Sequence, residues 1–158
     1  MSWRNPATRT MLLALGSMFF QQTFVSIAKV LPAVVAPMII ADLHYDPALV
    51  GVYFGITSLF ALTSQMGCGS FIVRHGPLRM SQVALVGVAI GTLAMAVGWT
   101  LTFLASAVIG GAAAAVSTPT SSQLLGRWSP PRLAPLVFST KQTAVPAGLL
   151  IGGAIGPS

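Results

Sequence analysis

The chain has 158 residues, of which 54% are hydrophobic and only 6% are charged. In soluble domains roughly a quarter of all residues are charged. The eight basic and two acidic side chains of this chain are too few to cover the surface of a soluble domain of this size. This composition excludes an ordinary cytosolic enzyme, a disordered protein and a nucleic-acid-binding module. The apolar stretches are long and lack the alternation of barrel strands. The sequence therefore predicts an all-α integral membrane protein in the lipid bilayer.

Five apolar segments long enough to cross a membrane follow one another along the chain. Two prolines in the first segment, Pro32 and Pro37, are expected to kink its outer half. Asp46 and Pro47 have the residue types of a helix cap and a first helical residue, and Pro135 opens the last segment. The predicted spans of this single transmembrane domain, 1–158, are residues 11–40, 47–72, 78–98, 101–125 and 135–156.

The charged residues predict how these spans are oriented, because loops rich in Lys and Arg stay in the cytoplasm. The two acids, Asp42 and Asp46, lie together between the first two spans. The six arginines lie before the first span, at the break where the second span ends and the third begins, and between the fourth and fifth: Arg4, Arg9, Arg74, Arg79, Arg127 and Arg132. The alternation has no violation and places the N-terminus in the cytoplasm. The basic excess is thus a topology signal, and no nucleic-acid partner is expected.

Small residues recur in four spans at the spacing that lets helix backbones approach closely. One interpretation is static packing within the bundle, and the other is a surface that slides during a conformational cycle. The residues are Gly51 and Gly55, Gly87 and Gly91, then Ser106, Gly110, Ala113, Ser117 and Ser121, and finally Gly148, Gly152 and Gly156.

Polar side chains inside the predicted spans are the candidates for a solute cavity. A lysine at membrane depth costs roughly 2.5–3.5 kcal/mol, so it usually faces a partner or a wet cavity. Lys29 and Lys141 are such residues, although either could instead extend toward a lipid headgroup. Gln21 and Gln22 either bond between helices or line a route. We expect Gln22, Lys29, Lys141 and Gln142 to line the cavity. Two cations facing one cavity favour an anionic or carboxylate-bearing solute.

The sequence lacks the residues that proton coupling, catalysis or metal binding would need. The chain has no Glu, and neither Asp lies in a predicted span, so no proton carrier can be identified. Cys68 is the single cysteine and is expected to be a small core residue, while His44 and His75 lie in opposite loops. No catalytic acid, base or nucleophile set is present. The sequence predicts neither an enzyme nor a bound metal or cofactor.

The loop between the second and third spans, Gly69–Arg79, resembles the signature loop of the major facilitator superfamily. In that pattern a glycine is followed by small or aliphatic residues, Asp-Arg, a glycine and basic residues. Gly69, Arg74, Gly76 and Arg79 match, and Val73 replaces the aspartate. The resemblance implies that this loop is a conformational gate. The buried arginine that many members carry in the fourth span is absent, so its role in proton coupling does not transfer.

The fifth span, at Phe138–Gly148, looks like that of a bacterial branch related to cyanate-type permeases. This resemblance implies a bacterial inner-membrane protein in which Lys141 and Gln142 face the central cavity. The superfamily is built from two halves of six spans with the solute site between them. The chain then corresponds to an incomplete N-terminal half, truncated before a sixth helix. It is expected to need the C-terminal half or a second membrane chain.

The resemblance implies secondary active or facilitative transport of a small solute by alternating access. Two other functions stay open on the residues alone. The chain could be a subunit that packs its glycine faces against another membrane protein, or a membrane fragment that does not transport.

Overall fold

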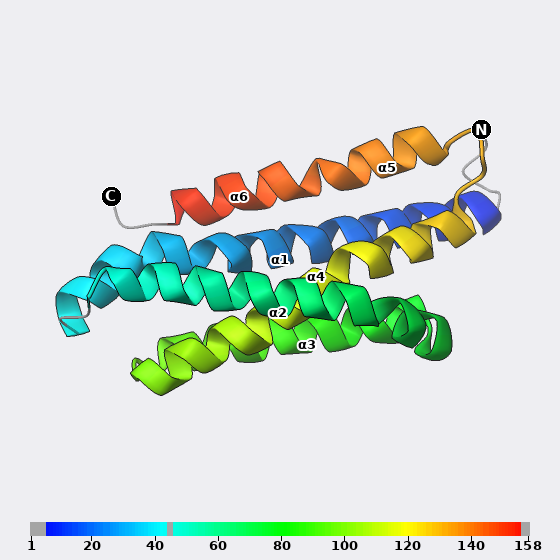
Figure 1. Ribbon diagram of the computed structural model, residues 1–158. Coiled ribbons are helices and arrows are strands. Elements are labelled where there is room, and N and C mark those ends of the chain that lie inside the picture. The colour runs from blue at the N-terminus through cyan, green and yellow to red at the C-terminus, as the bar shows by residue number, and fades with distance from the viewer. Residues whose placement is uncertain (1–5, 44–45, 156–158) are drawn as a thin grey trace.

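The computed structural model describes residues 6–43 and 46–155, and within these ranges the chain is helical without any strand. The elements are α1 (Pro6–Leu43), α2 (Ala48–His75), α3 (Pro77–Ala96), α4 (Thr100–Trp128), α5 (Ala134–Gln142) and α6 (Ala144–Ala154). Figure 1 shows them as long rods that run alternately in opposite directions, with α5 and α6 forming one broken rod. The all-α bundle of five rods predicted from the sequence is confirmed for the described residues.

Two glycines make the tight connections possible. Gly76 separates α2 from α3 with φ +84°, and Gly98 precedes α4 with φ +79°; both values lie in the left-handed region that suits glycine. The Gly76 N–H donates to the Ile72 carbonyl at 2.9 Å and so closes α2. Pro77 then opens α3 at a position where its missing N–H costs nothing.

The predicted fifth span is interrupted at Thr143, where α5 ends and α6 begins. Pro146 has no N–H to donate to the carbonyl of Gln142, four residues earlier. The Thr143 N–H is shared between the carbonyls of Ser139 and Thr140, each at 3.2 Å. Proline therefore tightens one turn, while the two short helices keep a common direction (Figure 1).

The expected cap of the second span is present, with a small shift. The Asp46 carboxylate accepts a hydrogen bond of 2.8 Å from the Ala48 N–H. Pro47 is the flanking residue, so α2 begins at Ala48 rather than at Pro47. This bond satisfies one of the amides that every helix start leaves without an internal partner.

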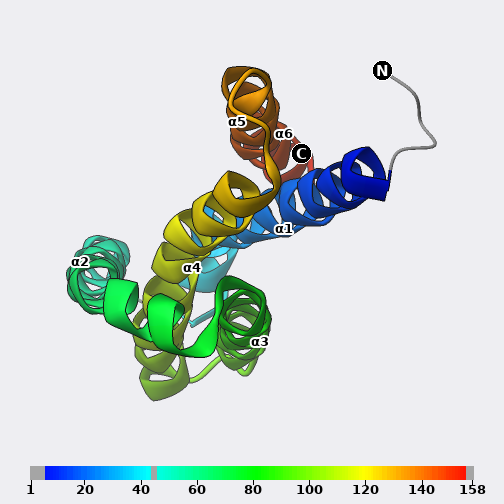
Figure 2. The ribbon, with the colours of Figure 1, turned by 90° about the vertical axis from the view of Figure 1, so that its right-hand side faces the viewer.

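Four described helices, α1 to α4, are long and apolar enough to cross a membrane, judged by length and composition. Helices α5 and α6 are individually too short for that criterion, with 9 and 11 residues. Helix α4 packs against α1, α2 and α3, and α6 packs against α1. The end-on view in Figure 2 shows α4 running across the bundle. Helices α2 and α3 flank one part of α4, and α5 lies beyond its other end. Helix α4 is the common neighbour of α1, α2, α3 and α5.

The basic segments meet at one end of the bundle. Figure 1 shows the start of α1, the α2–α3 turn and the α4–α5 link together, and the α1–α2 and α3–α4 connections at the opposite end. The described arginines belong to the first group, and Asp46 belongs to the second. This arrangement agrees with the predicted alternation. The side of the membrane that holds the basic end stays a prediction, and Arg4, His44 and Gly156 lie outside the described residues.

Of the four predicted faces of small residues, those on α3, α4 and α6 pack closely against a neighbouring helix. A Cβ at Gly91 would lie 2.9 Å from the Gly110 backbone, and one at Gly148 would lie 2.5 Å from the Thr23 carbonyl. The close contacts between α3 and α4 and between α1 and α6 therefore require glycine at these positions. Gly51 has no atom within 4 Å of a Cβ position, and the same is true of Gly55. No described residue therefore packs against the face of α2 that carries Gly51 and Gly55.

Candidate functional site

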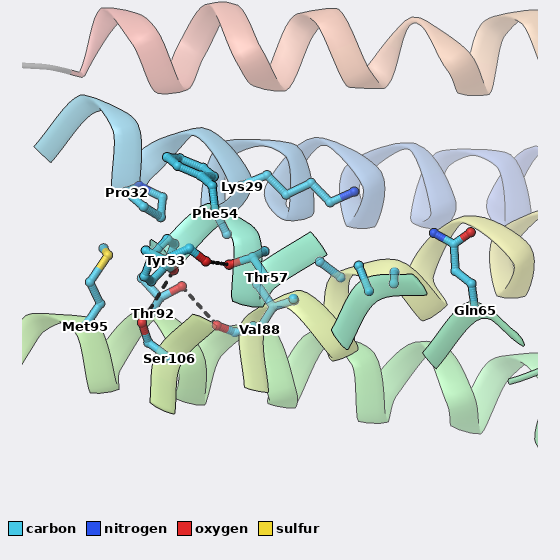
Figure 3. A pocket seen from close by; sticks show the side chains of 17 residues that line it. Lys29, Pro32, Tyr53, Phe54, Thr57, Gln65, Val88, Thr92, Met95 and Ser106 are labelled. Atoms are coloured by element: carbon cyan, nitrogen blue, oxygen red, sulfur yellow. Dashed lines mark hydrogen bonds between the residues drawn. The ribbon is translucent and has the colours of Figure 1, made fainter. Parts of the chain in front are cut away.

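A cavity of about 240 Å³ lies between α1, α2, α3 and α4. Its polar side chains are Lys29, Tyr53, Thr57, Gln65, Thr92 and Ser106. Figure 3 shows the Lys29 side chain extending along the cavity, with Gln65 on the side toward which its ammonium points. The α4 side of the cavity is lined mainly by alanine and glycine, whose small size leaves room for the cavity. The cavity is mainly apolar with a few polar groups, as solute sites usually are.

The α2 wall carries its polar groups on one face. Tyr53, Thr57 and Gln65 are spaced by four and eight residues, which places them along one side of a helix. The Thr57 hydroxyl donates to the Tyr53 carbonyl at 2.8 Å, so its hydrogen is used within α2. The Gln65 side chain has no hydrogen-bond partner among the described residues, and its amide is available to a solute.

Tyr53 is a rigid part of this wall. Its ring lies 4.5 Å from that of Phe103, centroid to centroid, and Met95 and Ala107 complete the same cluster. The Ser106 hydroxyl is 3.4 Å from the Tyr53 hydroxyl and 2.6 Å from the Phe103 carbonyl. The tyrosine therefore keeps a fixed position and presents both an aromatic surface and a hydroxyl.

Lys29 determines the electrostatics of the cavity. It is the only charged side chain among the described residues that line it. Its ammonium forms no hydrogen bond or ion pair with any described residue, and the side chain is exposed. Asp46, the one acid whose side chain is described, belongs to the connection before α2. Within the described residues, the charge of this ammonium is therefore not compensated by an acidic side chain.

Lys141 occupies a different place. It is 1% exposed, and its ammonium donates to the Thr118 carbonyl at 3.2 Å and to the Ser122 hydroxyl at 2.9 Å. Both acceptors lie on α4, so the lysine connects α5 to α4 and does not line the cavity. The adjacent Gln142 is exposed.

The two glutamines of α1 are buried, each 3% exposed. Gln21 donates from Nε2 to the Ser117 hydroxyl at 3.3 Å and to the Ser81 carbonyl at 3.4 Å. It thus links α1, α3 and α4, as one of the two interpretations predicted. Gln22 Oε1 has no partner within the described chain. Of the four predicted cavity residues, Lys29 alone lines the cavity in this arrangement of the helices.

The predicted gate loop lies at the basic end, around the α2–α3 turn. Arg74 and Arg79 are exposed, and neither forms an ion pair with a described residue. Val73, at the position of the missing aspartate, is 70% exposed. Gly76 has the positive φ that makes the turn, whereas Gly69 lies on an open face of α2.

Sequence reasoning missed most of the cavity wall. Tyr53, Thr57, Gln65 and Thr92 were not expected there, although the regular spacing on α2 is a usable signal. No group of three or more metal-binding side chains occurs within the described ranges.

Comparison with known proteins identifies one family. A model described as Major Facilitator Superfamily matches residues 12–158. Neither the curated proteins nor the solved structures include a significant match.

Proposed function

The chain belongs to the major facilitator superfamily of multi-pass membrane transport proteins, and we propose that it helps to move a small anionic or carboxylate-bearing solute by alternating access. The observation that carries this proposal is the position of Lys29, whose ammonium has no partner among the described residues and lies along an apolar cavity. A solute anion would supply the missing negative charge.

The cavity suits a small solute. Its volume of about 240 Å³ lies below the roughly 300–1,000 Å³ typical of ligand pockets. The Gln65 amide and the Tyr53 hydroxyl can bond to oxygen atoms of the solute, while the Tyr53 ring contacts its apolar part. Because the binding groups come from different helices, relative movement of those helices would change the affinity.

Gln22, Lys141 and Gln142 belong to this proposal as groups that reach the solute in a second arrangement of the helices. In the arrangement described, α4 holds the Lys141 ammonium. Alternating access requires at least two arrangements, and release of this ammonium is one difference between them.

A second set of helices would complete the solute site, either a C-terminal half or another membrane chain. The supporting observation is the open face of α2 around Gly51 and Gly55. We further propose that the arginine-rich end faces the cytoplasm of a bacterium and that the chain lies in the inner membrane, because basic loops are retained inside.

The test is anion uptake by membrane vesicles from cells that express the gene product. Radiolabelled cyanate, acetate and benzoate serve as probes, with vesicles lacking the protein as blank. Saturable uptake of at least one anion is expected, and Lys29→Met should reduce its kcat/KM at least tenfold. Lys29→Arg should restore part of it, and Arg132→Gln, outside the cavity, should leave it unchanged. Equal kinetic constants for Lys29→Met and the unaltered protein would contradict the proposal.

The open α2 face also favours the alternative of a packing subunit without transport activity. That function predicts that a second membrane protein is cross-linked to a cysteine placed at Gly55 in a Cys68→Ser background. It also predicts that Lys29→Met changes neither complex formation nor any uptake. Anion uptake that depends on Lys29 excludes it.

A further inference from the structure

A second hollow lies between α3 and α4 and differs from the solute cavity in every lining residue. It measures about 360 Å³ and is lined only by apolar side chains and glycine, with none from α1 or α2. Met80, Val83 and Gly87 contribute from α3, and Ile109 and Val116 from α4. We call it the α3–α4 groove. No side chain that lines it can form a hydrogen bond to a polar solute.

The α3–α4 groove forms because small residues at its base let the two helices approach closely, while larger side chains border it on the outside. A Cβ at Gly87 would lie 2.7 Å from the Cβ of Ala113. Val83 is 63% exposed and Ile109 is 38% exposed, so they border the groove and face outward. Figure 2 places α3 at the edge of the bundle. In a membrane, an exposed apolar surface of this kind can contact the acyl chains of lipids.

One end of the groove is basic. Arg79, Val83 and Gly87 are four residues apart and share a face of α3, with Arg79 one turn nearer the helix start. On α4, Arg127 follows Val116 by eleven residues, which is about three turns, with Pro119 inside the helix between them. Both arginines are exposed. The start of α3 and the end of α4 lie at the same end of the bundle (Figure 1).

This combination of an apolar trough and two cations fits an amphiphile with a negatively charged head. Arginine binds phosphate oxygens through paired N–H donors. We propose that the α3–α4 groove binds an acyl chain of an anionic glycerophospholipid, whose phosphate lies at Arg79 and Arg127. The site is separate from the solute cavity and does not depend on the proposed transport function.

Quenching of tryptophan fluorescence by brominated lipids tests this site. The full chain carries Trp3→Phe, Trp99→Phe and Trp128→Phe, with a single new tryptophan through Val83→Trp. It is reconstituted in phosphatidylcholine vesicles containing either dibrominated phosphatidylglycerol or dibrominated phosphatidylcholine at equal, low content. Each surface arginine contributes about fivefold in affinity for anionic lipid. Quenching is therefore expected to show at least a fivefold preference for phosphatidylglycerol.

Val86→Trp in the same background is the matched control, since Val86 is an exposed α3 residue outside the groove. Its quenching should show no preference above twofold. Combined Arg79→Gln and Arg127→Gln should abolish the preference at position 83, while Arg74→Gln on α2, at the same end, should retain it.

Three outcomes would overturn the proposal. Equal preference at positions 83 and 86 would mean general attraction to the membrane surface. Equal quenching by both lipids at position 83 would mean that the head group is not recognised. Absence of quenching at position 83 alone would mean that protein, such as a second copy of the chain, covers the groove.

Discussion

The ammonium of Lys141 on α5 donates a hydrogen bond of 2.9 Å to the hydroxyl of Ser122 on α4. The lysine is almost fully buried and has no acidic partner among the described residues. A neutral hydroxyl and a backbone carbonyl therefore hold a cation inside the bundle, which makes the α4–α5 contact sensitive to either partner.

Ser122→Ala is expected to destabilise the protein, because the Lys141 ammonium loses one of its two acceptors. The loss of a hydrogen bond to a charged group costs about 1.5–3 kcal/mol. Thermal unfolding in detergent, followed by circular dichroism, measures it. Ser139→Ala is the control, since Ser139 is exposed and bonds only within its own helix. Equal melting temperatures for the two variants would show that Lys141 does not depend on Ser122.

Lys141→Met separates an anchoring role from a direct role in solute binding. If the ammonium reaches the solute only after it leaves α4, the variant should lower the maximal rate of saturable anion uptake at least fivefold and change KM less than twofold. Uptake kinetics in vesicles, corrected for the amount of protein, provide the measurement. An unchanged maximal rate would remove Lys141 from the transport proposal.

Gly148→Ala should weaken the α1–α6 seam. Its Cβ would lie 2.5 Å from the Thr23 carbonyl and 2.6 Å from the Ser26 Cβ, and such overpacking typically costs about 1–3 kcal/mol. Gly153→Ala, in the same helix with nothing within 4 Å, should be neutral or stabilise by about 0.4–1 kcal/mol. The two melting temperatures should thus move apart. A stable Gly148→Ala variant would contradict the close approach of α1 and α6.

Gly76→Ala should strain the α2–α3 turn, because φ is +84° at this position. Because ψ is also +149°, the conformation is one that essentially only glycine adopts, and a side chain there costs about 1–3 kcal/mol. Gly69→Ala lies in the same signature loop but within α2 and in open space, so it should not lower the melting temperature. If both substitutions have the same effect, backbone conformation is not the reason for glycine at Gly76.

Much of the fold was predictable from local features. Long apolar segments without the alternation of barrel strands form helices in a membrane, because every backbone polar group needs an internal partner there. Prolines and glycines mark the ends, as at Gly76 and Pro77. The break at Thr143 was missed, although Pro146 accounts for it, and α1 extends beyond the predicted 11–40 at both ends.

The candidate site was predictable only in part. Lys29 was expected at a cavity because a cation is costly in an apolar span. The same reasoning applied to Lys141, yet its bonds to α4 satisfy the ammonium. Sequence shows that a buried cation needs acceptors, but it does not show whether a solute or another helix supplies them.

The amino-acid sequence by itself determined the membrane class, the helical architecture and the separation of basic and acidic ends, since these follow from composition, hydrogen-bond requirements and charge placement along one chain. The tertiary structure alone decided that Tyr53 and Gln65 join Lys29 at one cavity, and that α3 and α4 together form the α3–α4 groove. The physical reason is that such contacts depend on which faces of separate helices meet, and glycine-dependent approaches such as Gly91 to Gly110 set that geometry.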